Sequence, residues 1–338
     1  MISALVTVAC TVTMCGCTID INAEDISKLY TMFNDVAEQR DDETGKIGYR
    51  FLDAEEGSRL LLSNSNYYDK LTTENLRYRM RDKDANLEKY REFAGSQVLD
   101  YTQEEKEAIA DAIDFVESRF DEIGFEWPIE EDILFVRTTM KEEPGAGGYT
   151  HKNQIYLGGT IFDYAFSDEE SDRDFFKCIV AHEISHVLTR NDPQFREKLY
   201  SLIGFTVDDK EPDFSEEVFE NILSNPDVEA YDCHGQFTID GKKTDATIVT
   251  MITKPYEDGA VMLKSVEAAL VPIDAPDHFV SVEDVPDFYD VVGRNTGYVI
   301  AAEECMADNF SYAIVYGTDH DYEDPELIQG VLDFLSEK

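Results

Sequence analysis

The sequence predicts an α+β fold, and three observations lead to this class. Residues 102–124 repeat apolar side chains with the 3.6-residue period of an amphipathic helix. Short runs rich in β-branched and aromatic residues follow at 133–136 and 154–157, and a hairpin pattern occupies 237–249. A chain of 338 residues is long enough to bury one large core or two lobes.

The composition is strongly acidic, with 72 Asp and Glu against 29 Lys and Arg and a net charge of −43. A hydrophobic content of 43% still indicates a folded chain rather than a disordered one. The charge argues against nucleic-acid binding, which needs basic patches, and against adsorption to an anionic membrane surface. It favours cationic substrates or divalent ions, although the usual role of such charge is solubility.

The first 18 residues carry no charged side chain, and Met14-Cys15-Gly16-Cys17 closes their apolar run. This ending resembles the lipobox of bacterial lipoproteins. The resemblance implies a signal peptide at 1–16, lipidation of Cys17 and an extracytoplasmic protein anchored to a bacterial cell membrane. Met14 departs from the usual leucine, and no Lys or Arg precedes the run. An uncleaved transmembrane anchor is the alternative.

Residues 17–100 are polar and irregular, and we expect a helical N-terminal accessory region that spaces the rest of the protein from its anchor. The helix at 102–124 then has a capping box at Thr102 and Glu105 and ends at Gly124. The two predicted strands are separated by a turn or loop at 144–148.

A second helix is predicted to follow, from a capping box at Ser171 and Asp174 to a stop at Asn191-Asp192-Pro193. It contains His182, Glu183 and His186, which form the motif H-E-x-x-H. Residues four apart lie one helical turn above each other, so both imidazoles can reach one ion, which suits Zn²⁺. Glu183 lies about 100° round the helix and can reach a water there without binding the ion. The simpler interpretation is a helix with two surface histidines and a glutamate.

This stretch resembles the active helix of the zincin metallopeptidases. The resemblance implies a two-lobed fold with one catalytic Zn²⁺ in the cleft between the lobes. It also implies that the last strand before the metal helix is a sheet edge, to which a peptide substrate adds. Residues 153–158 are the candidate edge, and an ordinary buried strand is the alternative.

A catalytic zinc needs a third protein ligand. Thr189 and Asp192 exclude the metzincin pattern, and 317–321 misplaces the aspartate of the aspzincin loop by one residue. Glu304 and Asp308 are four apart on one predicted helix, in an E-x-x-A-D pattern that resembles gluzincin peptidases. That resemblance implies Glu304 as the ligand and Asp308 as the acceptor that orients His182. A solvated acidic face is the alternative.

The same resemblance implies a mechanism in which Glu183 is the general base for a water activated by zinc. A further donor would stabilise the oxyanion, and the sequence leaves several candidates open. These are Tyr231, His234, Arg294, Tyr298 and His320. We expect His151 and His278 to be surface or loop residues.

The remaining chain gives a domain plan. We predict a catalytic region at 101–338, made of an upper lobe with the metal helix, an inserted lobe and a C-terminal part with the third ligand. Their bounds are 101–204, 205–295 and 296–338. The expected elements are short helices at 214–223 and 261–270, a hairpin turning at Asp240-Gly241, and helices at 299–315 and 324–336.

Cys178, Cys233 and Cys305 are an odd number of cysteines after Cys17, so no disulfide framework is implied, and either one pair or three free thiols fits. The functional hypothesis is an exported zinc endopeptidase acting on a peptide or protein substrate. Its rivals are a zinc hydrolase of cell-wall amides and a non-catalytic zinc-containing binding lipoprotein.

Overall fold

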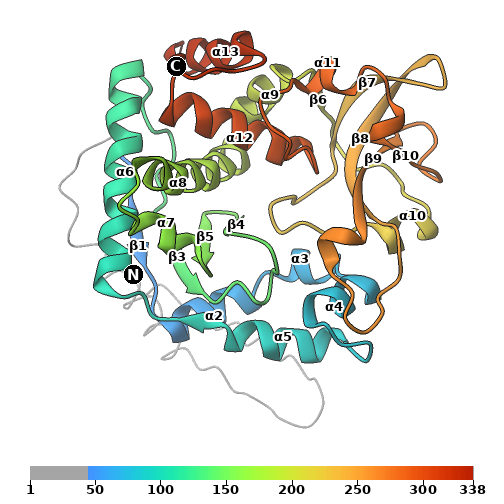
Figure 1. The fold of residues 1–338 in the computed structure, drawn as a ribbon, viewed down its shortest axis with the longest axis horizontal. Coiled ribbons are helices and arrows are strands. Elements are labelled where there is room, and N and C mark those ends of the chain that lie inside the picture. Colours follow the sequence, from blue (N-terminus) through green and yellow to red (C-terminus); the bar gives the residue numbers. More distant parts are fainter. Residues whose placement is uncertain (1–44, 338) are drawn as a thin grey trace, which may run out of the picture. The chain divides into compact units, whose positions relative to one another are not determined.

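Two β-sheets organise residues 45–337, which are the residues that the computed structural model describes. Runs of helices and runs of strands are interspersed along them, so the predicted α+β class is confirmed (Figure 1). The predicted signal peptide at 1–16 and its lipidation site Cys17 lie outside the described residues. A search of the described helices finds none with the length and apolarity needed to cross a membrane.

The first sheet is mixed and has the strand order β1-β3-β5-β4, with β2 pairing beside β1 on β3. The predicted edge at 153–158 is wrong, because β5 lies between β3 and β4 and is fully buried, as the alternative expected. The edge is β4, which pairs antiparallel with β5, and only its first residue, Gly148, lies in the segment 144–148 predicted as a turn or loop. The strands are β1 (Tyr49–Phe51), β2 (Val98–Leu99), β3 (Ile133–Thr138), β4 (Gly148–His151) and β5 (Gln154–Gly158).

Four short helices precede the long one and pack on one face of this sheet, as Figure 1 shows at the bottom of the view. Three of them begin at side chains that accept a backbone N–H, namely Asp53, Thr72 and Asn86. The described part of the predicted accessory region therefore supplies helices, β1 and β2 to the same compact unit as the later chain. The helices are α2 (Ala54–Leu62), α3 (Ser65–Tyr68), α4 (Thr73–Met80) and α5 (Leu87–Ser96).

Long helices cover the other face and form the largest core cluster with it. The predicted capping box of Thr102 and Glu105 and the Gly124 end of α6 are confirmed. The predicted capping box at Ser171 is wrong, because α8 begins at Glu170 and its N-cap is Glu169, two residues before Ser171. The helices are α6 (Gln103–Ile123), α7 (Ile161–Ala165), α8 (Glu170–Asn191), α9 (Pro193–Ser201), α12 (Ala302–Val315) and α13 (Pro325–Ser336).

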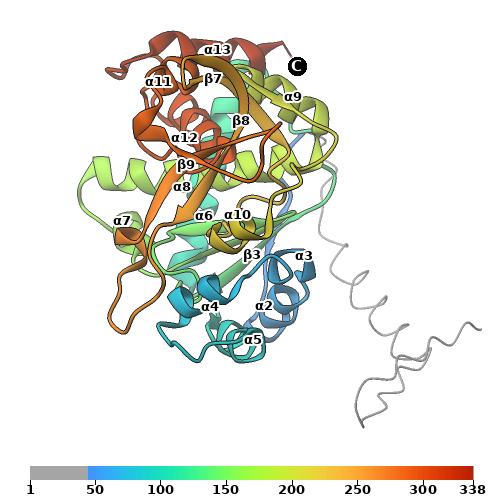
Figure 2. The ribbon, with the colours of Figure 1, turned by 90° about the vertical axis from the view of Figure 1, so that its right-hand side faces the viewer.

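The second sheet is antiparallel throughout, with the order β10-β9-β8-β7-β6. Its strands β7, β8 and β9 are labelled in Figure 2. Asp240 and Gly241 both have positive φ, which confirms the predicted hairpin turn. The predicted helix at 261–270 is wrong: the chain forms one short turn, η2, and then β9, because periodicity cannot distinguish a short apolar run in a strand from one in a helix. The elements are β6 (Phe205–Val207), α10 (Glu216–Asn221), β7 (Cys233–Ile239), β8 (Lys242–Ile252), η2 (Met262–Lys264), β9 (Val266–Pro272), β10 (Val280–Ser281), η3 (Val282–Asp284) and α11 (Phe288–Val292).

Candidate metal centre

Helices α8 and α12 lie side by side and bring together residues that are 122 positions apart in sequence (Figure 1). His182 and His186 occupy adjacent turns of α8, and Glu304 lies in the first turn of α12. All three side chains are buried: the residues are 7%, 2% and 1% exposed. The packing of the two helices therefore turns a local helical pattern into a three-dimensional cluster.

The donor atoms of these residues converge on one point. Glu304 Oε2 lies 3.0 Å from His182 Nε2 and 3.6 Å from His186 Nε2, and all three atoms lie within 4.8 Å of one another. Ligands at about 2.0–2.2 Å from a tetrahedral ion are separated by about 3.3 Å, so the spacing fits Zn²⁺. His186 Nε2 is buried without a hydrogen-bond partner in the described structure. A buried unpaired ring nitrogen facing a carboxylate and an imidazole is the arrangement that a metal ion would satisfy.

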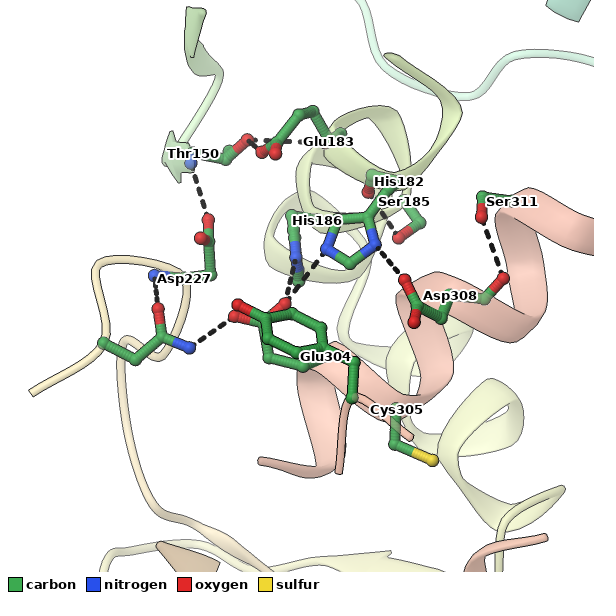
Figure 3. A network of polar contacts seen from close by, with 12 residues as sticks. Thr150, His182, Glu183, Ser185, His186, Asp227, Glu304, Cys305, Asp308 and Ser311 are labelled. Atoms are coloured by element: carbon green, nitrogen blue, oxygen red, sulfur yellow. Dashed lines mark hydrogen bonds and ion pairs between the residues drawn. The ribbon is translucent and has the colours of Figure 1, made fainter. Parts of the chain in front are cut away.

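Asp308 fixes the orientation of the His182 ring (Figure 3). Its Oδ1 lies 2.9 Å from His182 Nδ1, and its other oxygen accepts a hydrogen bond from the Thr296 hydroxyl. Burial would lower the pKa of His182, but the hydrogen bonds to Asp308 and Glu304 outweigh it and raise this pKa well above its usual value. A bond between Nδ1 and Asp308 leaves Nε2 as the nitrogen that faces Glu304 and His186.

Glu183 points away from Glu304 toward β4, where the Thr150 hydroxyl donates to its Oε2 at 2.7 Å (Figure 3). Gly148 lies on the same face of β4, and a Cβ added there would sit 2.6 Å from Glu183 Oε1. A side chain at position 148 would therefore require this carboxylate to shift. Burial raises the pKa of Glu183 to about 7, against the opposing effects of His182 and Thr150. A carboxylate with this pKa is suited to accept and return a proton near neutral pH.

Two residues of the site were not predicted from the sequence, and both lie on the segment between α10 and β7. The Asn225 side-chain amide donates to Glu304 Oε1. Asp227 is buried, accepts the backbone N–H of Thr150 at 2.6 Å, and has a carboxylate oxygen within 4.8 Å of donor atoms of Glu183 and His186. Burial and the charges of Glu183 and Glu304 raise the pKa of Asp227. No local pattern marks these residues, because the fold of a long connection places them.

The neighbouring acidic candidates lie elsewhere. Glu303 lies about 100° round α12 from Glu304 and accepts from Arg196 Nη2 at 3.0 Å. Asp319 and Asp321, the alternative from the aspzincin-like loop, are exposed beyond the end of α12. The structure therefore places Glu304, and neither Glu303 nor this pair, against the two histidines.

Of the predicted oxyanion donors, only Tyr298 lies at the site: it lines a cavity of about 390 Å³ together with His182, Glu183 and Glu304. The residue is 44% exposed. The others contact residues outside it: Tyr231 packs on Phe214, His234 contacts Asp208, Arg294 pairs with Asp290, and His320 stacks on Tyr316.

The expectation that His151 is a surface or loop residue is wrong, because it lies on β4 and is buried among tyrosine rings, whereas His278 is exposed. Cys178, Cys233 and Cys305 are buried free thiols. Comparisons of the chain with protein-family models, curated proteins and solved structures gave no significant match.

Proposed function

We propose that this protein is a zinc-dependent peptidase of the zincin class and gluzincin type. The observation that carries the proposal is the convergence of two histidines from α8 and one glutamate from α12, with a second glutamate beside them. Two imidazoles and one carboxylate form a ligand set typical of catalytic zinc, which keeps a fourth position open. A purely structural zinc site would gain nothing from a base such as Glu183.

A bound zinc ion would lower the pKa of water toward about 7 and polarise a carbonyl group. Glu183 takes the proton of the attacking water and returns it to the leaving nitrogen, so one water is consumed and one carboxylic acid and one amine are released. Asp308 holds the His182 ring in the orientation required for binding. Tyr298, at the wall of the cavity, is the candidate hydrogen-bond donor to the oxyanion.

The substrate would add as an extended strand to the edge of the first sheet. That edge is β4, one strand away from the predicted segment 153–158. Gly148 and Thr150 both lie next to Glu183, so a peptide paired with β4 is held beside the general base. A site that forms hydrogen bonds with the backbone of an extended chain favours peptides over other amides.

The test uses the full-length purified protein. Metal analysis should give about one zinc per chain, and His182→Ala with His186→Ala should abolish stoichiometric binding. Glu183→Gln should retain the zinc but lower the rate of peptide cleavage by at least about 10²-fold, the usual scale for a general base. His278→Ala, which removes an exposed histidine, is the matched control and should change neither quantity.

Full zinc occupancy in the double histidine variant would remove the site from consideration. Wild-type cleavage by Glu183→Gln would show that the chemistry lies elsewhere. Cleavage of cell-wall muropeptides in preference to a peptide library would favour the rival amide hydrolase. A zinc-loaded protein that cleaves neither would favour the rival binding protein.

A further inference from the structure

The edge of β4 is open at one end and closed at the other. Thr150 points its backbone groups outward from the sheet, and both are occupied: Asp227 accepts from its N–H, and Arg190 Nη1 donates to its carbonyl oxygen. Outward-facing groups alternate along an edge strand, so Gly148 presents its backbone in the same direction. An added strand could pair at Gly148 but not past Thr150.

The closed end is held firmly in place. Asn225 and Asp227 belong to one tight turn, in which the Asp227 N–H donates to Asn225 Oδ1 at 2.9 Å. The same Asn225 binds Glu304, so this turn bridges the third candidate ligand and the edge strand. The cavity continues in the other direction, along the glycine-rich segment 145–148 and the apolar side chains of Ile161 and Ile179.

Asp227 is the one acidic side chain of this cavity without a role in the proposed chemistry. Glu304 faces the histidines, Asp308 orients His182, and Glu183 is the base. Arg190 is the nearest cation, but its Nη2 is 3.9 Å from Asp227 and its Nε is also 3.9 Å from Glu229. Arg190 does not line the cavity, so the group that the closed end presents to a substrate is a carboxylate.

We propose that Asp227 binds the free α-amino group of the substrate, so that the enzyme removes single residues from the N-terminus of peptides. This inference rests on the proposed peptidase function and replaces the expected endopeptidase with an exopeptidase. An α-amino nitrogen and the carbonyl carbon of its own residue are about 2.5 Å apart. A carboxylate oxygen within 4.8 Å of Glu183 and His186 therefore places the first peptide carbonyl beside the base and the metal ligands.

The direction of strand pairing leads to the same end of the substrate. A strand added antiparallel to β4, the slightly more stable pairing, runs from the Thr150 end toward Gly148. Its N-terminus then meets Asp227, and its remaining residues extend along 145–148. Charge and strand direction are independent arguments, and both select the amino end.

The experiment compares one peptide in two forms, with a free and with an acetylated N-terminus, on zinc-loaded full-length protein. The wild type should release residues one at a time from the amino end of the free peptide, the first residue first, and acetylation should lower kcat/KM by at least about 10²-fold. Asp227→Asn keeps an oxygen for the Thr150 N–H but removes the charge. It should raise KM for the free peptide about tenfold or more and narrow the difference between the two forms.

Internal cleavage of the acetylated peptide at a similar kcat/KM would overturn the inference while leaving the peptidase function intact. An unchanged preference in Asp227→Asn would overturn the role of Asp227. Absence of zinc-dependent cleavage of both forms would overturn the proposed function itself. If Asp227→Asn does not fold, the wild type is tested for inhibition by phenylalaninamide and by its N-acetyl form. Only phenylalaninamide, which has a free amine, should compete with the peptide, and equal inhibition by the two compounds would overturn the inference.

Discussion

Two of the buried polar clusters in the described part of the chain differ in which hydrogen-bonding groups they leave without a partner. One is the candidate metal centre between α8 and α12. The other lies under the short N-terminal helices, where Arg79 and Glu143 form an ion pair at 2.9 Å, with side chains only 2% and 6% exposed. Both clusters remove charges from water, which is costly unless partners replace the water.

The Arg79 cluster supplies its own partners. Arg79 donates to Glu143, to Asn75 and to the backbone carbonyl of Ser224. Glu143 also accepts from the hydroxyls of Tyr67 and Tyr90. Neither member of this ion pair has a buried nitrogen or oxygen left without a hydrogen bond.

The candidate metal centre does not supply all of its partners. Within the described residues His186 Nε2 has no hydrogen-bond partner, and its nearest carboxylate oxygen, on Glu304, lies 3.6 Å away. Three possible metal-ligating atoms therefore face one another, whereas the Arg79 cluster has a cation at its centre. A buried polar cluster that is complete contributes to the fold, whereas an incomplete one with converging donors marks a place for a ligand. The predictions below test this distinction, from the largest expected effect to the smallest.

The largest expected effect is on zinc binding, and it should differ between substitutions of two adjacent glutamates of α12. Glu304→Ala should abolish stoichiometric zinc binding, because two protein ligands hold zinc poorly. Glu303→Ala is the matched control and should leave zinc binding intact, since Glu303 contacts Arg196 instead. Zinc titration with a competing chelator measures both, and tight binding by Glu304→Ala would overturn the gluzincin assignment.

Breaking the Arg79 cluster should lower the stability of the fold and leave zinc binding unchanged. Arg79→Met should lower the free energy of unfolding by about 3–5 kcal/mol, because it leaves Glu143 as a buried charge without its partner. Arg77→Met removes a more exposed pair with Glu74 on the same helix and should cost about 1 kcal/mol or less. Urea unfolding measures this difference. Loss of zinc affinity in folded Arg79→Met would mean that the two clusters are not independent.

Loss of the Asp308 carboxylate should weaken zinc binding by an intermediate amount. Asp308→Ala should lower zinc affinity about 10–100-fold, because it removes orientation of His182 rather than a ligand. Asp308→Asn retains an oxygen that can accept from His182 Nδ1 and should lose less. Equal losses in the two variants, measured by the same titration, would show that orientation is not what Asp308 contributes.

The smallest expected effect is the contribution of His151 to the stability of the fold at acidic pH. Burial, and then the charge of Arg190, lower the pKa of His151 to about 3. The unfolded chain binds this proton below about pH 6.5 and the folded chain does not, so stability falls as pH drops through this window. This group should cost about 1.4 kcal/mol between pH 7.5 and pH 5.5. His151→Gln should lose less stability than the wild type over this range by that amount in urea unfolding, and an unchanged slope would contradict the prediction.

The sequence predicted those features that nearby residues determine. The start and end of α6 follow from Thr102, Glu105 and Gly124, which act within one helical turn. The spacing of His182 and His186 likewise predicts a shared face of α8, where the structure places them. The four-residue spacing of Glu304 and Asp308 distinguishes Glu304 from Glu303, and in the structure Glu304 contacts His182 whereas Glu303 contacts Arg196.

The features that were missed depend on partners distant in sequence. The four residues of β4 become a strand only by pairing with β5, and β9 becomes one by pairing with β8. Asp227 enters the site because Asn225 contacts a helix 79 residues later in the chain. No periodicity in a single sequence reports such contacts, so the closed end of the cleft could not be predicted.

The separation of α8 and α12 along the chain has a consequence during biosynthesis. His182 and Glu304 are 122 residues apart, so the ribosome completes the paired histidines well before it adds their carboxylate. Until then a nascent chain has two of three ligands and holds zinc poorly. Premature termination before α12 leaves a product without the metal site. Under the proposed function, the complete ligand set would thus exist only after α12 has been translated and has packed on α8.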